Sequence, residues 1–205
     1  MRGSHIAIAA AIATATAVGS HSLHSQTPSE TPNVSAVTGG TYAIDPNHSQ
    51  VLFSFDHMGF TNNMGLFAQA SGSLMLDPAD PGKASVKVSL PINSVATGVP
   101  KFNEHLMSGD FFDVEKYPAA TFESTSVKVE GTEAEITGNL TIKGITKEVT
   151  LDARLIGTGA NPMSKKETVG FSAETAIKRS DFGLGLYVPV VGDTIALKIT
   201  AAFEK

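Results

Sequence analysis

Alternation of apolar and polar residues, from about residue 41 onward, is the feature that most limits the fold of this chain. Val51, Phe53 and Phe55 lie in one phase of the alternation, and the residues between them lie in the other. Because successive side chains of a strand point to opposite faces of the sheet, this period of two predicts half-buried β-strands. The polar outward faces favour antiparallel pairing.

About eight segments show this pattern, and turn residues separate several of them. Prolines and Gly82 form a turn over residues 77–82, while Gly131 and Gly144 mark tight reversals. Short connections between so many strands predict an all-β protein, either an eight-stranded antiparallel barrel of lipocalin-like build or a sandwich. The expected strands lie near residues 51–56, 66–76, 84–92, 119–129, 133–143, 147–157, 167–179 and 193–204.

One stretch, residues 100–113, lacks the alternation. Phe102 and Leu106 are spaced four residues apart, which is the spacing of one helix face. We therefore expect one or two short helical turns here, with Ser108 as a cap for the second. This helical insertion falls between the third and fourth expected strands and would lie across one end of a barrel.

The length of 205 residues allows one domain, or at most two small ones, and the composition excludes several kinds of site. The formal net charge of −5 argues against binding to nucleic acid or to an anionic membrane, because both need a cationic face. It contains no cysteine, so disulfides, thiolate metal sites and thiol nucleophiles are excluded. Residues 19–40 are rich in Ser, Thr, Pro and His, which is typical of a disordered linker, and we assign the folded domain to residues 41–205.

The N-terminus has the features of an export signal. Arg2 precedes an apolar run at residues 6–18, and Ala15 and Ala17 give a small-x-small cleavage pattern. The run is shorter than the ~20 residues of a membrane span. We expect residues 1–18 to be a cleaved signal peptide that sends the protein to the periplasm or outside the cell, although the first five residues also resemble an expression tag.

Many inward positions of the expected strands carry small residues. An eight-stranded barrel is wide enough either to be filled by side chains or to hold one small ligand. Larger inward residues, Phe122, Leu140 and Phe171, either fill this space by interdigitation or line a cavity, and strand patterning leaves both possibilities open. The small inward residues are Ala68, Ala70, Gly72, Ala84, Ala134, Gly138, Ala153, Ala173 and Ala201.

The residue types of common catalytic and metal sites do not fall at useful spacings. His48 and His57 are an odd number of residues apart, so on an unbroken strand they face opposite sides, and His105 lies in the helical stretch. Asp110 and Asp113 are better explained as helix-capping residues than as an acid and base pair. No nucleophile elbow or nucleotide-binding glycine loop occurs, so we expect no catalytic residue, no metal and no cofactor.

Residues 178–187 combine basic residues with a glycine-rich apolar stretch. One explanation is an ordinary strand end with solvated charges. The other places Arg179 at a cavity mouth, where its guanidinium pairs with an anionic head group. Phe182, Leu184, Leu186 and Tyr187 would then form part of the apolar wall.

Four blocks, residues 42–57, 103–118, 138–152 and 179–193, make the chain similar to a known family. In their order and spacing they resemble the YceI-like family of bacterial polyisoprenoid-binding proteins. The second block departs from the family pattern at Glu104, where Asp is usual.

The resemblance implies a lipocalin-like barrel with a long apolar tunnel, a periplasmic or secreted location, possible homodimers, and isoprenoids, quinones or fatty amides as ligands. His57, His105 and Arg179 are the polar candidates at the tunnel mouth. The residues expected to line or cap the tunnel are Phe53, Phe55, Phe111, Phe112, Phe122, Leu140, Phe171 and Phe182.

The function expected from these observations is non-catalytic carriage or storage of one long apolar ligand. Two alternatives remain at this point. One is a structural or stress-response protein with a filled barrel, and the other is an enzyme that modifies an isoprenoid lipid at His57 or His105.

Overall fold

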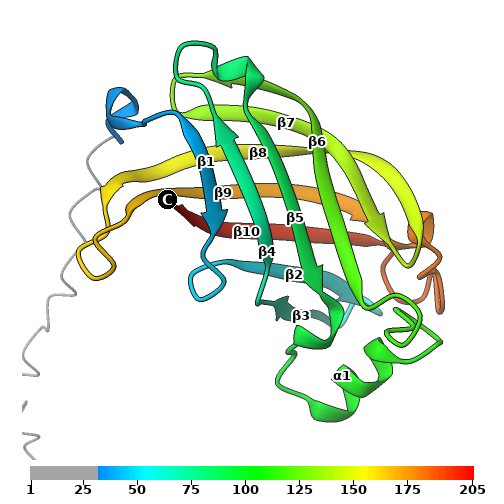
Figure 1. Cartoon of the computed structure of the whole chain (residues 1–205). Coiled ribbons are helices and arrows are strands. Elements are labelled where there is room, and N and C mark those ends of the chain that lie inside the picture. The colour runs from blue at the N-terminus through cyan, green and yellow to red at the C-terminus, as the bar shows by residue number, and fades with distance from the viewer. Residues whose placement is uncertain (1–31) are drawn as a thin grey trace, which may run out of the picture. The chain divides into compact units, whose positions relative to one another are not determined.

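The computed structural model describes residues 32–205, so the signal-like segment at residues 1–18 lies outside the described residues (Figure 1). The described part contains ten strands, one α-helix and four 3-10 turns. The strands are β1 (Gly40–Ile44), β2 (Gln50–His57), β3 (Thr61–Phe67), β4 (Ser71–Leu76), β5 (Ser85–Pro91), β6 (Ala119–Glu130), β7 (Glu133–Ile142), β8 (Ile145–Ala160), β9 (Glu167–Lys178) and β10 (Thr194–Glu204). The helix is α1 (Pro100–Met107), and the 3-10 turns are η1 (Val34–Ala36), η2 (Pro81–Lys83), η3 (Ile92–Ser94) and η4 (Arg179–Phe182).

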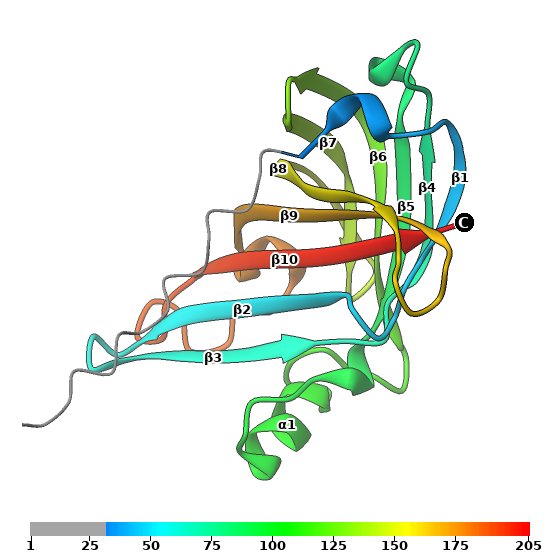
Figure 2. The ribbon, with the colours of Figure 1, turned by 90° about the vertical axis from the view of Figure 1, so that its left-hand side faces the viewer.

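Eight strands close into an antiparallel ring. Their order is β1-β4-β5-β6-β7-β8-β9-β10, and β1 pairs with β10 to complete the ring. The hairpin of β2 and β3 extends this sheet beyond the ring, because β2 pairs with β10 and β3 pairs with β2 (Figure 2). The predicted eight-stranded antiparallel barrel is confirmed.

Strand β10 pairs with both β1 and β2 because the chain bends between these two strands. Ile44 pairs with Phe203 at one end of β10, and Val51 pairs with Ile199 further along. At the bend, the buried Ser49 hydroxyl accepts a hydrogen bond from the Ala202 N–H at 3.1 Å. A side chain thus replaces a backbone partner where the ladder is interrupted.

The prediction of one continuous strand over residues 66–76 is wrong. The structure divides it into β3 and β4, and Gln69 between them has φ 59°, in the left-handed region. The break changes the phase of the alternation: Ala68 is the inward position expected from the sequence, but its neighbour Phe67 is only 8% exposed and lies in the core. Ala70 points inward as predicted, and Leu74 also lies on the interior side of the barrel.

The helical insertion closes a gap beside β3. The helix begins with Pro100 in its first turn and ends at Ser108, whose hydroxyl donates to the His105 carbonyl at 2.7 Å. Ser108 therefore ends α1 and does not start a second helical turn. Side chains fill the space between this segment and the hairpin: the ring centroids of Phe67 and Phe112 are 5.7 Å apart, in an edge-to-face arrangement.

The structured part begins earlier than the expected domain start at residue 41. Part of the stretch assigned to the linker forms η1, and Gly40 already belongs to β1. Hydrogen bonds of Thr38 hold this segment against the barrel. Its hydroxyl donates to the Glu167 carboxylate, and its carbonyl oxygen accepts from the hydroxyl of the buried Tyr42 at 2.9 Å. The hydrogen bond from Thr38 is the largest cause that lowers the pKa of Glu167.

Within residues 32–205, no helix has the length and apolar character needed to cross a membrane.

Candidate functional site

A cavity of about 950 Å³ occupies the interior of the barrel. Its lining extends from Pro78 and Gly131, in the turns at one end, to His105 and Tyr187 at the other. We call the end with His105 and Tyr187 the mouth. The interior is therefore not filled by side chains, which was one of the two possibilities that strand patterning left open.

The wall of the cavity is predominantly apolar. Seven of the eight residues expected to line or cap it do lie on it. Phe182 does not: it is 2% exposed and packs in the core, because it is the last residue of η4, where the alternation of β9 has ended. The residues on the wall are Phe53, Phe55, Phe111, Phe112, Phe122, Leu140 and Phe171.

Aliphatic residues make up much of the remaining wall and were not among the named candidates. All but Ile92, which lies in η3, occupy the inward phase of the same strands, so continuing the alternation along each strand would have found them. Between them lie Ala153 and Ala173, whose short side chains leave the centre of the barrel open. The aliphatic wall residues include Val51, Leu90, Ile92, Ile142, Val149, Leu151, Ile177, Ile195, Leu197 and Ile199.

Two glycines provide room for aromatic rings of the wall. A Cβ atom at Gly65 would lie 2.5 Å from Cζ of Phe53, which is its cross-strand partner. A Cβ atom at Gly138 would likewise lie 2.5 Å from Cζ of Phe122. Both distances are shorter than van der Waals contact, so these rings can lie over the neighbouring strand only because the glycines have no side chain.

Two histidines contribute polar groups to the cavity lining. His57 ends β2 and forms an isolated β-bridge with Val191, and His105 comes from α1. The His105 Nε2 atom lies 3.6 Å from the Asp110 carboxylate. The His105 ring packs edge-to-face against the Phe111 ring, with 4.9 Å between the ring centroids. Among residues 32–205, no group of three or more His, Asp or Glu side chains is arranged to hold a metal ion.

Arg179 also lies on the cavity lining, but its guanidinium is occupied by backbone carbonyls. Its Nε donates to Gly192 at 2.8 Å, and its Nη2 donates to Val191 at 2.9 Å. Its Nη1 donates to Leu184 and, at 2.8 Å, to Leu186. Burial lowers the pKa of this guanidinium. The expected pairing with an anionic head group is therefore not what the geometry favours: Arg179 holds the loop after η4 in place.

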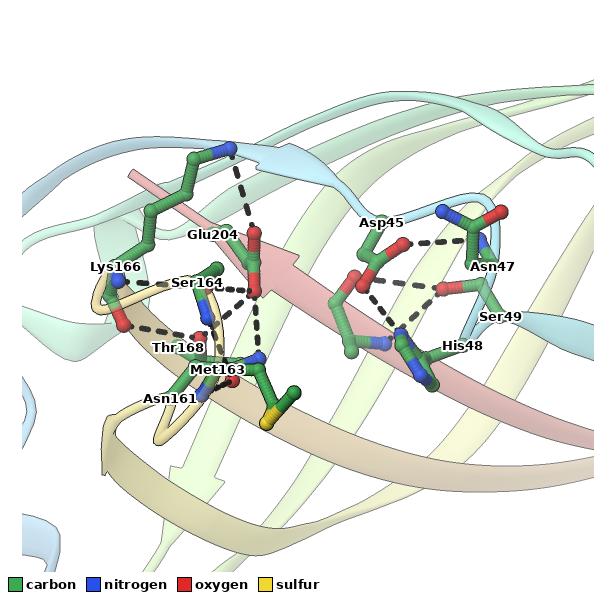
Figure 3. Close-up of polar contacts among 11 residues, drawn as sticks. Asp45, Asn47, His48, Ser49, Asn161, Met163, Ser164, Lys166, Thr168 and Glu204 are labelled. Carbon is green, nitrogen blue, oxygen red and sulfur yellow. Dashed lines mark hydrogen bonds and ion pairs between the residues drawn. The ribbon is translucent and has the colours of Figure 1, made fainter.

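A smaller cavity of about 360 Å³ lies near the barrel seam, at the end opposite the mouth. Figure 3 shows the polar contacts in this region. Its polar side chains are occupied by one another. The Glu204 carboxylate accepts hydrogen bonds from Asn161 at 2.9 Å and Ser164 at 3.0 Å, and Asp45 lies 2.6 Å from the His48 ring. The Glu204 contacts connect the β8–β9 turn to β10, and the Asp45 N–H joins the β1–β2 bend to β10 by donating to the Ala202 carbonyl at 2.8 Å, so we interpret the cluster as structural.

Comparison with known proteins agrees with this architecture. The family model described as "YceI-like domain" matches residues 42–203. The chain belongs to the YceI-like family. Protein YceI of Salmonella arizonae is 43% identical over 145 residues, which cover 70% of this chain and 75% of that protein.

Solved structures of similar proteins share the YceI-like barrel. Burkholderia cenocepacia BcnA superposes with a TM-score of 0.69 at 28% identity and covers 78% of this chain and 98% of its own. A polyisoprenoid binding domain from Saccharophagus degradans gives a TM-score of 0.62, over 80% of this chain and 97% of that domain. At 16% identity, the second match shows the fold alone. The predicted family resemblance is confirmed.

Proposed function

We propose that this protein binds one long apolar lipid of the polyisoprenoid class in the barrel cavity, carries or stores it, and catalyses no reaction. The observation that carries the proposal is the continuous apolar cavity of about 950 Å³. The polyisoprenoid binding domain of Saccharophagus degradans, which has the same fold, supports the choice of ligand class.

The size of the cavity suits a long chain. At about 30 Å³ for each water-sized or methylene-sized group, about 950 Å³ holds at most roughly 30 such groups. Each methylene removed from water contributes about 0.8 kcal/mol, against association costs of about 4–15 kcal/mol. A ligand that buries about twenty groups therefore has enough apolar surface to bind tightly without any charged contact.

The charged residues of the wall favour an uncharged head group. Arg154 forms an ion pair with Glu133, with 3.5 Å between Nε and Oε1, and Arg179 donates hydrogen bonds to backbone carbonyls. Within residues 32–205, these are the only two Lys or Arg side chains of the lining, so an anionic head would have to displace existing contacts. The imidazoles at the mouth can instead exchange hydrogen bonds with a hydroxyl, a quinone carbonyl or an amide.

The location follows from the sequence and is part of the proposal. The apolar run and cleavage pattern of residues 1–18 support export, so the carrier would act in the periplasm or outside the cell. Fractionation of cells that express the full chain, with N-terminal sequencing of the mature protein, tests this part.

The binding proposal is tested by native mass spectrometry of protein purified without detergent, followed by titration with an isoprenoid alcohol and with the phosphate of the same alcohol. We expect one ligand per chain and affinity for the alcohol at least equal to that for its phosphate. A chain that is isolated empty and binds neither probe would overturn the proposal. Preference for the phosphate would overturn the uncharged head group alone.

An enzyme acting at the mouth would depend on its histidines. The variant that combines His57→Ala with His105→Ala is therefore expected to retain ligand binding within a few-fold. If the wild-type protein converts the bound lipid and this variant does not, the non-catalytic assignment is wrong.

A further inference from the structure

Large apolar side chains are exposed to solvent around the mouth. Phe60 is 86% exposed and Val190 is 62% exposed, and Met58, Leu186 and Tyr187 are exposed beside them. We call these five residues the mouth rim. Single exposed apolar residues are common on protein surfaces, but a group of them around one opening marks an interaction surface.

The mouth rim comes from two loops that lie side by side. Met58 and Phe60 belong to the turn between β2 and β3, and the other three belong to the loop between η4 and β10 (Figure 2). The Gly192 N–H donates to the Asp56 carbonyl at 2.9 Å, which ties the second loop to the hairpin. The two loops therefore present one surface.

This surface is continuous with the cavity. Met58, Leu186 and Tyr187 are exposed and also line the cavity, whereas Phe60 and Val190 lie beyond the lining. An apolar path thus leads from the outside of the protein to the interior. Arg179 fixes one side of this path through its hydrogen bonds to Leu186 and to its neighbours.

The backbone also holds two rim residues in an unusual conformation. Met58 has φ 61° and Tyr187 has φ 66°, in the left-handed region that glycine adopts most readily. Both positions nevertheless carry large apolar side chains. A surface loop selected only for its shape would gain from glycine at these positions, so the side chains themselves require an explanation.

Charge distinguishes the two loops of the mouth rim from the turns at the opposite end of the barrel. Residues 57–65 and 182–192 contain no Lys, Arg, Asp or Glu. The turns at the opposite end carry Asp80, Lys83, Glu130 and Glu133. An uncharged apolar surface is complementary to an uncharged lipid bilayer, and it does not attract nucleic acid or an anionic membrane.

We propose that the mouth rim is a membrane-docking surface, which inserts into the interfacial region of an uncharged bilayer. Phe and Tyr side chains are favoured at that depth. With the rim inserted, the proposed lipid passes between bilayer and cavity without exposing its chain to water. The passage of ligand rests on the proposed function, but docking does not.

The test is co-flotation with phosphatidylcholine vesicles. The variant that combines Phe60→Ser with Val190→Ser removes two apolar rim side chains that do not line the cavity. The matched control is Met163→Ser, because Met163 is 89% exposed on the β8–β9 turn at the opposite end. We expect the wild-type protein and the control to bind vesicles equally, and the double variant to partition about ten-fold or more weakly. Added salt is expected to change binding little.

Four results would overturn the docking proposal. They are no binding of the wild-type protein to any vesicle, equal losses in the double variant and the control, binding only to anionic vesicles that salt abolishes, and a wild-type dimer that the double variant converts to monomer. The last result would show that the rim is covered by a second copy of the chain.

Two further measurements separate folding and ligand binding from docking. Tyr187→Gly suits the backbone at its position, so this variant should fold normally and still dock more weakly. Unchanged vesicle binding by both Tyr187→Gly and the folded double variant would contradict the proposal. Titration with an isoprenoid alcohol in vesicle-free solution should give the same affinity for the wild-type protein and the double variant. Absence of ligand binding together with intact docking would refute the proposed function alone.

Discussion

Replacement of Ala153 by Phe should shorten the longest ligand that the cavity accepts. Ala153 lies near the middle of β8, opposite Ala134 and Ala173, and its methyl group faces the cavity. A phenyl ring at this position enters open space and does not overpack a filled core. We therefore expect the variant to fold with a melting temperature close to that of the wild-type protein.

The magnitude follows from the volume of the ring. Its six carbons occupy the space of about six ligand methylenes, at about 0.8 kcal/mol for each. A ligand that fills the wild-type cavity should then lose about 5 kcal/mol, which is more than a thousand-fold in affinity. A ligand shorter by about six groups should bind almost unchanged, because it does not need the space that the ring occupies.

The assay is displacement of an apolar fluorescent dye by isoprenoid alcohols of increasing chain length. The matched control is Ala176→Phe, since Ala176 is exposed on the outer face of β9. The expected result is a maximum in affinity that moves to shorter chains for Ala153→Phe and stays in place for the control. Equal losses at every chain length would refute the assignment of the ligand to the centre of the barrel.

Three other predictions concern stability. Arg179→Met should lower the free energy of unfolding by about 3 kcal/mol or more, measured by urea denaturation, and Arg179→Lys should not restore it, because an ammonium group cannot serve the same set of carbonyls. Ser49→Ala should cost about 1–2 kcal/mol in the same assay, because the Ala202 N–H loses its partner, whereas Ser49→Thr should cost less if the hydroxyl is what matters. The hydrogen bond with Asp45 raises the pKa of His48 above 6.5, and the same bond lowers that of Asp45 below 3.8. The stabilisation by this pair should therefore be complete between these values and be lost as the pH rises through the folded pKa of His48 or falls through that of Asp45. A difference in melting temperature between the wild-type protein and His48→Gln that persists unchanged at alkaline pH would contradict this assignment.

The barrel itself could be predicted from the sequence because one local rule operates along most of the chain. The alternation around Phe53 and Phe55 gives the correct inward phase, and the turns at Gly131 and Gly144 lie where the strands reverse. The rule fails where the chain leaves the ladder. Gln69 adopts a positive φ although it is not glycine, and the Ser49 hydroxyl replaces a backbone partner of the ladder. Neither feature has a sequence signature.

The candidate site was predicted less well at its polar end. Phe182 has the residue type of the tunnel wall, but a short 3-10 turn directs it into the core. The role of Arg179 depends on carbonyl groups that converge from Leu184 to Gly192. Every residue has a carbonyl group, so no residue pattern could identify these partners before the loop was seen in three dimensions.

The place of β3 in the sheet has a mechanical consequence. At the seam the circumference of the barrel is set by paired strands, whereas beside β3 it is set by the packing of side chains such as Phe67 and Phe112. A strand ladder breaks in discrete steps, but the packing of apolar side chains can yield in small increments as rotamers shift. The two ends of the barrel should therefore differ in stiffness. The end beside β3 can adjust its diameter to a bulky or branched ligand chain, while the end at the β1–β10 seam keeps the barrel closed.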